Sequence, residues 1–232
     1  GQYNLAKDID EVRRFKLEMD SKYKPRDWDA EKLYAFESST GKEFSLNLQQ
    51  IMSLYAFSKR EQAYSHLISG GFVFEENSTV IVEKNGVKKT YIHKGATSYK
   101  LNVATLNRIV NSLTDEQKAY VDEMQTFLSD VMGAKGNEVS MMLYGIKMFG
   151  EKNYFPIHIA GQFKAQAQES QAKAAEGFQS MSNAGFTHAQ NPNAKAPFVL
   201  EGFNEVWSDH VNEMSRYHGT VPALEDIRKV MN

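Results

Sequence analysis

The chain has 232 residues, 41% of them hydrophobic, with 27 basic and 29 acidic side chains and no cysteine. This apolar fraction is too high and the net charge of −2 too small for a disordered chain, and the near-neutral balance gives no overall field for nucleic acid or an anionic membrane. The lack of cysteine excludes a disulfide scaffold, a zinc–thiolate site, an iron–sulfur cluster and a cysteine nucleophile.

The first part of the chain predicts helices. Apolar residues recur at helical spacing over residues 4–20, and a short helical pattern follows over 28–36. Asn47 and Gln50 form a capping pair before a helix of about two dozen residues that should end at Gly70-Gly71. The inward face of the first helix is expected to carry Ile9, Val12, Phe15 and Met19.

A short β region should follow at about 72–92, beginning with the apolar run 72–74. Two β-rich runs, 79–84 and 87–92, flank Asn85-Gly86. This pair predicts a hairpin because both central residues of the tight turn must accept positive φ. Since a lone hairpin is only marginally stable, it must lie against the helices.

Helices should then return over residues 103–113 and again after Thr114, which forms a capping box with Gln117. The helix after Thr114 should reach Met132 and be broken by Gly133 and Gly136. A further helix is expected over 137–149, followed by a short strand over 154–159.

The composition changes after Gly161. Residues 162–176 are rich in Ala and Gln and favour a helix, whereas residues 177–197 combine Asn, Gly and Pro and predict a long loop. A strong amphipathic helix should span 198–219, and Pro222 should begin a last helix.

These elements predict a mainly α protein, a multi-helix domain with one small antiparallel β-hairpin as an α+β minority. We expect a helical domain over residues 1–161 and an Ala/Gln-rich helix and flexible loop over 162–197. C-terminal helices over 198–232 should pack on the first domain. No segment approaches the roughly 18 apolar residues of a membrane span, and no secretion signal is recognisable.

The best candidate for a metal site lies on the helix before Pro222. His210 and Glu213 are three residues apart on one helix face, and His218 falls near that face at the expected helix end. The preferred interpretation is that these histidines are solvated or interact with the helix dipole. His158 is a weaker candidate as a strand-end base, and common enzyme motifs such as G-x-S-x-G and H-E-x-x-H are absent.

The hairpin region is locally basic, with six basic and three acidic side chains between residues 70 and 114. Interleaved Tyr91 and Tyr99 would let such a ribbon bind phosphates and stack bases. The preferred alternative is that edge lysines discourage aggregation. The candidate nucleic-acid ligands are Lys84, Lys88, Lys89, Lys94 and Lys100.

Methionines gather near the middle of the chain, at Met141, Met142 and Met148. They are expected either to fill gaps in the core or to form an adaptable groove for a partner.

Two stretches are distinctive when taken together. The first runs from Ile51 through His66 to Gly71, and the second combines 153–157 with Phe203-x-x-Val206-Trp207-x-x-His210 and 217–230. In this order they resemble a helical region of the very large polyvalent proteins of phages and integrative conjugative elements of Firmicutes. The resemblance covers roughly residues 45–232 and carries no catalytic motif, so it implies no site residue and no cofactor.

The resemblance agrees with the chain ends, since Gly1 replaces an initiating Met and the C-terminus stops inside an amphipathic pattern; both predict a fragment. The favoured hypothesis is a non-catalytic structural or interaction module of a giant phage or mobile-element polypeptide. Its partners would be other modules of that polypeptide or phage and conjugation proteins, in the bacterial cytoplasm or a phage particle. The alternatives are a nucleic-acid-contacting module using 84–100 and a metal-dependent hydrolase at 209–218.

Overall fold

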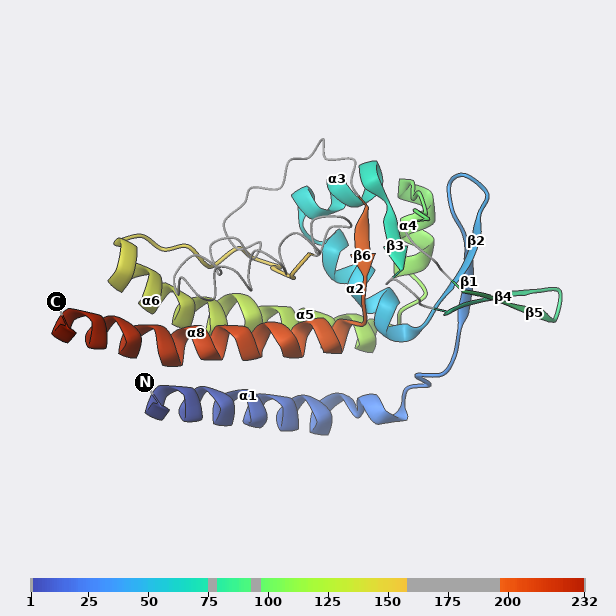
Figure 1. Ribbon diagram of the computed structural model, residues 1–232. Helices are drawn as coiled ribbons and strands as arrows, with labels where there is room; N and C mark the ends of the chain where they lie inside the picture. Colours follow the sequence, from blue (N-terminus) through green and yellow to red (C-terminus); the bar gives the residue numbers. More distant parts are fainter. Residues whose placement is uncertain (1, 75–78, 93–96, 158–196, 232) are drawn as a thin grey trace.

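A computed structural model of the protein describes residues 2–74, 79–92, 97–157 and 197–231. These residues form a mainly helical protein with small two-stranded sheets, including antiparallel hairpins, which confirms the predicted fold class. The long helices lie side by side in one part of the molecule, and the shorter helices and the sheets gather at the other (Figure 1).

The long helices surround an aromatic core. They are α1 (Gln2–Tyr23), α8 (Phe203–Met231) and one continuous helical run made of α5 (Asp115–Thr126), the π-helix η2 (Phe127–Met132) and α6 (Gly133–Tyr144). Phe15 of α1 stacks on Phe127 with ring centroids 4.1 Å apart, and both rings lie against Trp207 of α8. The Trp207 indole is fully buried, and its Nε1 donates to the carbonyl of Met124 at 2.8 Å.

The shorter helices are α2 (Leu48–Ser58), α3 (Glu61–Gly70) and α4 (Val103–Val110). Both predicted capping boxes are present: Asn47 with Gln50 before α2, and Thr114 with Gln117 before α5. Helix α2 packs on α4 and α5. The contact buries Leu54, Leu106 and Ile109 completely.

Each of the sheets has two strands. Strands β4 (Thr79–Lys84) and β5 (Val87–Ile92) form the predicted hairpin, in which Asn85 and Gly86 take φ of 53° and 76°. Strand β3 (Phe72–Phe74) pairs in parallel with β6 (Phe198–Leu200), which brings together two segments far apart in the sequence. Strands β1 (Tyr34–Glu37) and β2 (Glu43–Leu46) form a second antiparallel hairpin, preceded by a short 3-10 helix, η1 (Pro25–Asp27).

Several predicted elements differ in the first half of the chain. The helical pattern over 28–36 is wrong, because residues 34–37 alternate between half-buried and exposed, which suits strand β1. The helix expected to run to Gly70 is two helices. Arg60 takes an extended backbone between them, and the Lys59 and Arg60 side chains turn to Asp122 and Glu151.

In the second half of the chain, the helix boundaries predicted from glycine and proline residues are wrong. Gly133 and Gly136 do not break the helix; a Cβ at Gly136 would lie 2.6 Å from the Met214 Cε, so this glycine permits close packing with α8. Helix α6 ends at Tyr144, five residues before the expected end. Pro222 does not begin a new helix but lies inside α8, although it cannot donate a backbone hydrogen bond to His218.

The elements predicted on either side of residues 158–196 also differ from those in the structure. Residues 198–200 are a strand, and helix α8 begins only at Phe203. Residues 154–157 are not a strand; Tyr154 and Phe155 instead enter the core, where Phe155 stacks on Phe203 at 5.0 Å. The rest of that predicted strand, the helix 162–176 and the loop 177–196 lie outside the described residues.

Candidate functional site

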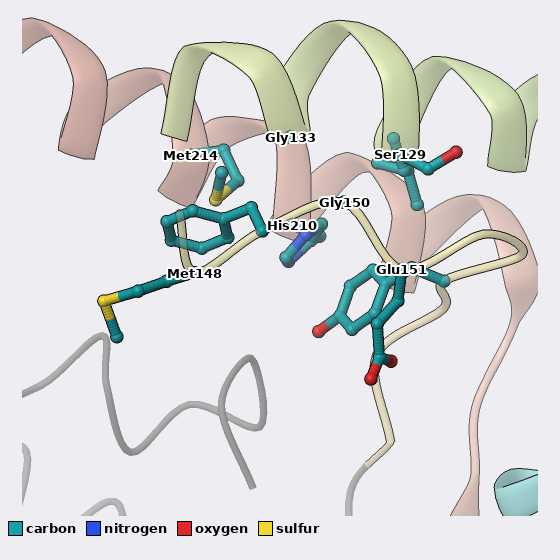
Figure 2. A pocket seen from close by; sticks show the side chains of 10 residues that line it. Ser129, Gly133, Met148, Gly150, Glu151, His210 and Met214 are labelled. Atoms are coloured by element: carbon teal, nitrogen blue, oxygen red, sulfur yellow. The ribbon is translucent and has the colours of Figure 1, made fainter. Parts of the chain in front are cut away.

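A small cavity lies where η2, α6 and α8 meet the loop after α6. Figure 2 shows Ser129 and Gly133 from the first two, His210 and Met214 from α8, and Met148, Gly150 and Glu151 from the loop. Asn137 fixes this loop to α6, since its Nδ2 donates to the Phe149 carbonyl at 2.7 Å and its Oδ1 accepts from the Phe149 amide at 2.9 Å.

The polar groups around the cavity are engaged with one another. The buried His210 ring lies 5.3 Å from the ring of Tyr154. Burial raises the pKa of the Tyr154 hydroxyl, and the nearby Arg60 guanidinium only partly opposes this. Arg60 also forms an ion pair with Glu151 at the cavity rim.

The size of the cavity decides what it can hold. Its volume is about 20 Å³, which admits one water molecule, whereas small-molecule sites typically measure about 300–1,000 Å³. A larger hollow of about 430 Å³ is lined only by one continuous segment, between Leu17 and Asp27, and is open to solvent. Neither feature is a substrate pocket with converging catalytic groups.

The structure does not gather the metal-site candidates. His210 is buried beside Tyr154, Glu213 is exposed, and His218 lies two turns further along α8. In the described part of the chain, no group of three or more His, Asp or Glu side chains has a geometry that could hold a metal ion. His158 and His188 lie outside the described residues.

His218 has a different setting from the one predicted. It is not at a helix end, because α8 continues to Met231. Its Nδ1 lies 2.5 Å from Asp8 Oδ2 of α1, and its Nε2 lies 2.8 Å from Glu138 Oε2 of α6. Lys135 Nζ contacts Asp8 Oδ1 and Glu11 Oε2, each at 2.8 Å. We call these five residues the clasp, since they join α1, α6 and α8.

The sequence contained a signal for the clasp that the helical pattern obscured. The expected inward residue Ile9 is 44% exposed, whereas Asp8 is only 1% exposed. The correct inward series of α1 therefore runs through Leu5, Asp8, Val12, Phe15 and Met19. A carboxylate in an otherwise apolar helical series predicts a buried partner cation.

The lysines of the hairpin region do not form one described surface. Lys88 and Lys89 are exposed neighbours on β5, so their side chains leave opposite faces of the hairpin. Lys100 lies outside the hairpin, where its Nζ donates to the carbonyls of Ser69 and Gly70 and closes the C-terminus of α3. Lys94 lies outside the described residues, and of Lys84 only the backbone is described.

Helices α6 and α8 finish at the same end of the molecule (Figure 1). Exposed apolar side chains are concentrated in the segments that form these two helix ends. Of the thirteen exposed large apolar side chains among the described residues, eight lie in two short segments, 141–146 and 224–231. We call these two segments the distal end. Met141 and Met142 belong to it and are therefore not core gap-fillers. The eight side chains are Met141, Met142, Tyr144, Ile146, Leu224, Ile227, Val230 and Met231.

No family model, no curated protein and no solved structure matches this chain. Among the helices that the structure describes, none combines the length and the apolar character needed to cross a membrane.

Proposed function

We propose that this chain is a non-catalytic interaction module, and that another module of the same polypeptide binds its distal end. The observation that carries the proposal is the concentration of eight exposed large apolar side chains on segments 141–146 and 224–231. Monomeric soluble proteins rarely leave large apolar patches uncovered, and such patches mark sites of association.

The distal end contributes little to the folding of the bundle itself. The residues 226–231 of α8 are all exposed, whereas Trp207, Val211 and Met214 of the same helix are buried. Burying apolar surface is worth about 25 cal/mol per Å². The distal side chains have not gained this energy within the described residues, so a partner can still provide it.

The side chains of the distal end suit a protein partner. Met141 and Met142 are unbranched and flexible, which allows them to adapt to an opposing surface. Tyr144 offers a large ring with a polar hydroxyl, a combination enriched in interface cores. The proposal assigns no catalytic residue and no cofactor.

The kind of polypeptide follows from the resemblance of residues 45–232 to a helical region of phage and mobile-element polyvalent proteins. On that basis we place the module in a giant polypeptide of the bacterial cytoplasm or of a phage particle. The complete open reading frame and its gene neighbours test this part directly. An open reading frame that encodes no further module would contradict it.

Site-specific photocrosslinking in the native cell tests the contact surface. A photoreactive residue would replace Ile227 at the distal end or, as a matched control, Leu17 on α1; these side chains are 56% and 62% exposed. The proposal expects a discrete product at position 227, with a peptide from another module of the same polypeptide, and none at position 17.

Three outcomes would contradict the proposal. Equal or absent products at both positions would show that the distal end is not a contact surface. A product with residues 158–196 of the same chain would show that the protein covers the surface itself. A product with a second copy of the chain would replace the assigned partner by self-association.

A further inference from the structure

The two halves of α1 are attached to the rest of the protein in different ways. In the C-terminal half, Phe15, Met19 and Tyr23 pack against the aromatic core. In the N-terminal half, the one buried side chain among the described residues 4–11 is that of Asp8. The first turns of α1 are therefore held by the Asp8 carboxylate together with the close packing of Leu5 on Gly219.

The protonation state of the clasp follows from its geometry. An ionised carboxylate can only accept hydrogen bonds. His218 faces Asp8 through Nδ1 and Glu138 through Nε2, so both ring nitrogens must donate for both contacts to be hydrogen bonds. With both carboxylates ionised, the two contacts are satisfied together only by a doubly protonated imidazolium.

The remaining charges of the clasp favour the same state. Asp8 and Glu11 face it from α1, and Lys135 and Glu138 face it from α6. Burial lowers the pKa of Lys135, but the hydrogen bonds and charges of Asp8 and Glu11 outweigh it and raise the pKa overall, so the ammonium group stays charged. Three carboxylates then face two cations while His218 is protonated, and only one cation after the imidazole loses its proton to solvent.

We propose that His218 is a pH-sensitive switch that locks the N-terminal half of α1 onto α6 and α8 when it is protonated. As the pH rises and the imidazolium releases its proton, one of the two donors is lost. The carboxylates of Asp8 and Glu138 then repel each other across a neutral ring. The residues 4–11 loosen, while residues 15–23 stay docked because apolar packing holds them.

Loosening of this segment uncovers a defined surface. Leu5 lies so close to Gly219 of α8 that a Cβ added there would be 2.9 Å from the Leu5 Cα. Release of residues 4–11 therefore exposes Gly219 and the neighbouring sides of α6 and α8.

Amide hydrogen exchange on the full chain tests the switch. Protection factors, corrected for intrinsic exchange, would be measured at a series of pH values from about 5.5 to about 8.5. Those of residues 4–11 should fall by about tenfold or more at the higher pH, because a charge-assisted hydrogen bond is lost. Those of residues 15–23 should not change.

Two variants separate the switch from a general effect of pH. His218→Gln keeps one donor and one acceptor but cannot gain a charge, so residues 4–11 should exchange rapidly and equally at all these pH values. Asp10→Asn removes an exposed carboxylate from the same half of α1 and should leave the wild-type pH dependence intact.

A second measurement keeps the test decisive if His218→Gln does not fold. In the wild-type protein, the nuclear magnetic resonance titration of the His218 ring should have the same midpoint as the change in exchange. The proposal is overturned by different midpoints, by protection that is the same at all these pH values, by a pH dependence that persists in His218→Gln, or by equal loosening of both halves of α1.

Discussion

The two halves of helix α8 carry similar apolar side chains in different surroundings. In the first half, Trp207, Val211 and Met214 are buried, and α8 packs there against α1, η2 and α6. In the second half, Leu224, Ile227 and Val230 are more than half exposed. The same helix thus serves the core of this protein over its first turns and presents an apolar surface over its last.

The comparison shows that the apolar content of a helix does not reveal what the helix packs against. The first half meets partners from distant parts of the chain, such as Phe15 and Met124. In the last turns, by contrast, residues 226–231 are all exposed. Stability measurements on the two halves should differ accordingly.

Truncation of a central core residue should have the largest effect. Trp207→Ala should lower the free energy of unfolding by about 3–5 kcal/mol, because it leaves a large cavity among Phe15, Phe127 and the Met124 carbonyl. Ile227→Ala on the same helix should change it by less than about 0.5 kcal/mol. Urea unfolding of both variants checks the pair, and a comparable loss in Ile227→Ala would mean that the distal end is packed.

The clasp lies between the buried and the exposed half of α8, and its loss should have the next largest effect on stability. Asp8→Ala should cost about 3 kcal/mol, because it removes the buried partner of Lys135 and His218. Asp10→Ala removes an exposed carboxylate two residues away and should cost less than about 1 kcal/mol. If thermal or urea unfolding gave equal losses of stability for the two variants, the clasp would not contribute to the stability of the fold.

Tyr120 of α5, a buried tyrosine whose hydroxyl bonds to Asn204 of α8, should make stability fall at alkaline pH. Burial raises the pKa of Tyr120 to about 12, and its hydroxyl donates a hydrogen bond to Asn204 Oδ1 at 3.0 Å. An unfolded tyrosine releases its proton near pH 10. The folded state therefore binds more protons above that pH, and this contribution to stability is lost as the pH rises from about 10 to about 12.

Tyr120→Phe should flatten this loss while lowering stability at neutral pH by about 1 kcal/mol, the value of one hydrogen bond. Tyr144→Phe, at the distal end, is the matched control because its side chain is exposed. Urea unfolding at about pH 9 and pH 11 compares the two. An unchanged slope in Tyr120→Phe would assign the alkaline loss to other groups.

The smallest expected effect concerns the hairpin as a rival contact surface. We expect no measurable specific DNA or RNA binding at about 150 mM salt, because Lys88 and Lys89 leave opposite faces of the hairpin and the chain from residue 115 onward has ten basic and fifteen acidic side chains. Fluorescence anisotropy checks this. Micromolar binding that disappears in Lys88→Glu/Lys89→Glu would make the hairpin, and not the distal end, the functional surface.

Signals that depend on neighbouring residues could be predicted from the sequence. The capping boxes at Asn47 and Thr114 and the turn at Asn85-Gly86 form as expected, because caps and tight turns are fixed by local backbone geometry. Strand β1 was missed because its alternation covers only four residues, too few to distinguish a strand from a short helix.

Features set by distant residues could not be predicted in the same way. The parallel pairing of β3 with β6 joins residues 72 and 198, and nothing in either run indicates the other. Gly136 was expected to break the helix, because glycine usually does so. Its actual role is to allow close packing against Met214, a residue that is distant in the sequence. The clasp was hidden for the same reason, since its members come from α1, α6 and α8, and only His218 was singled out.

The contact of Leu5 with Gly219 also orders events during protein synthesis. Ribosomes add about 5–20 residues per second, so α1 emerges roughly 10–40 s before the part of α8 that it must meet. During that interval the inward face of α1, with Phe15 and Met19, has no α8 to pack against. The bundle is therefore completed only after residues 203–231 have been synthesised, and a nascent chain stalled before residue 203 would expose this apolar face to chaperones.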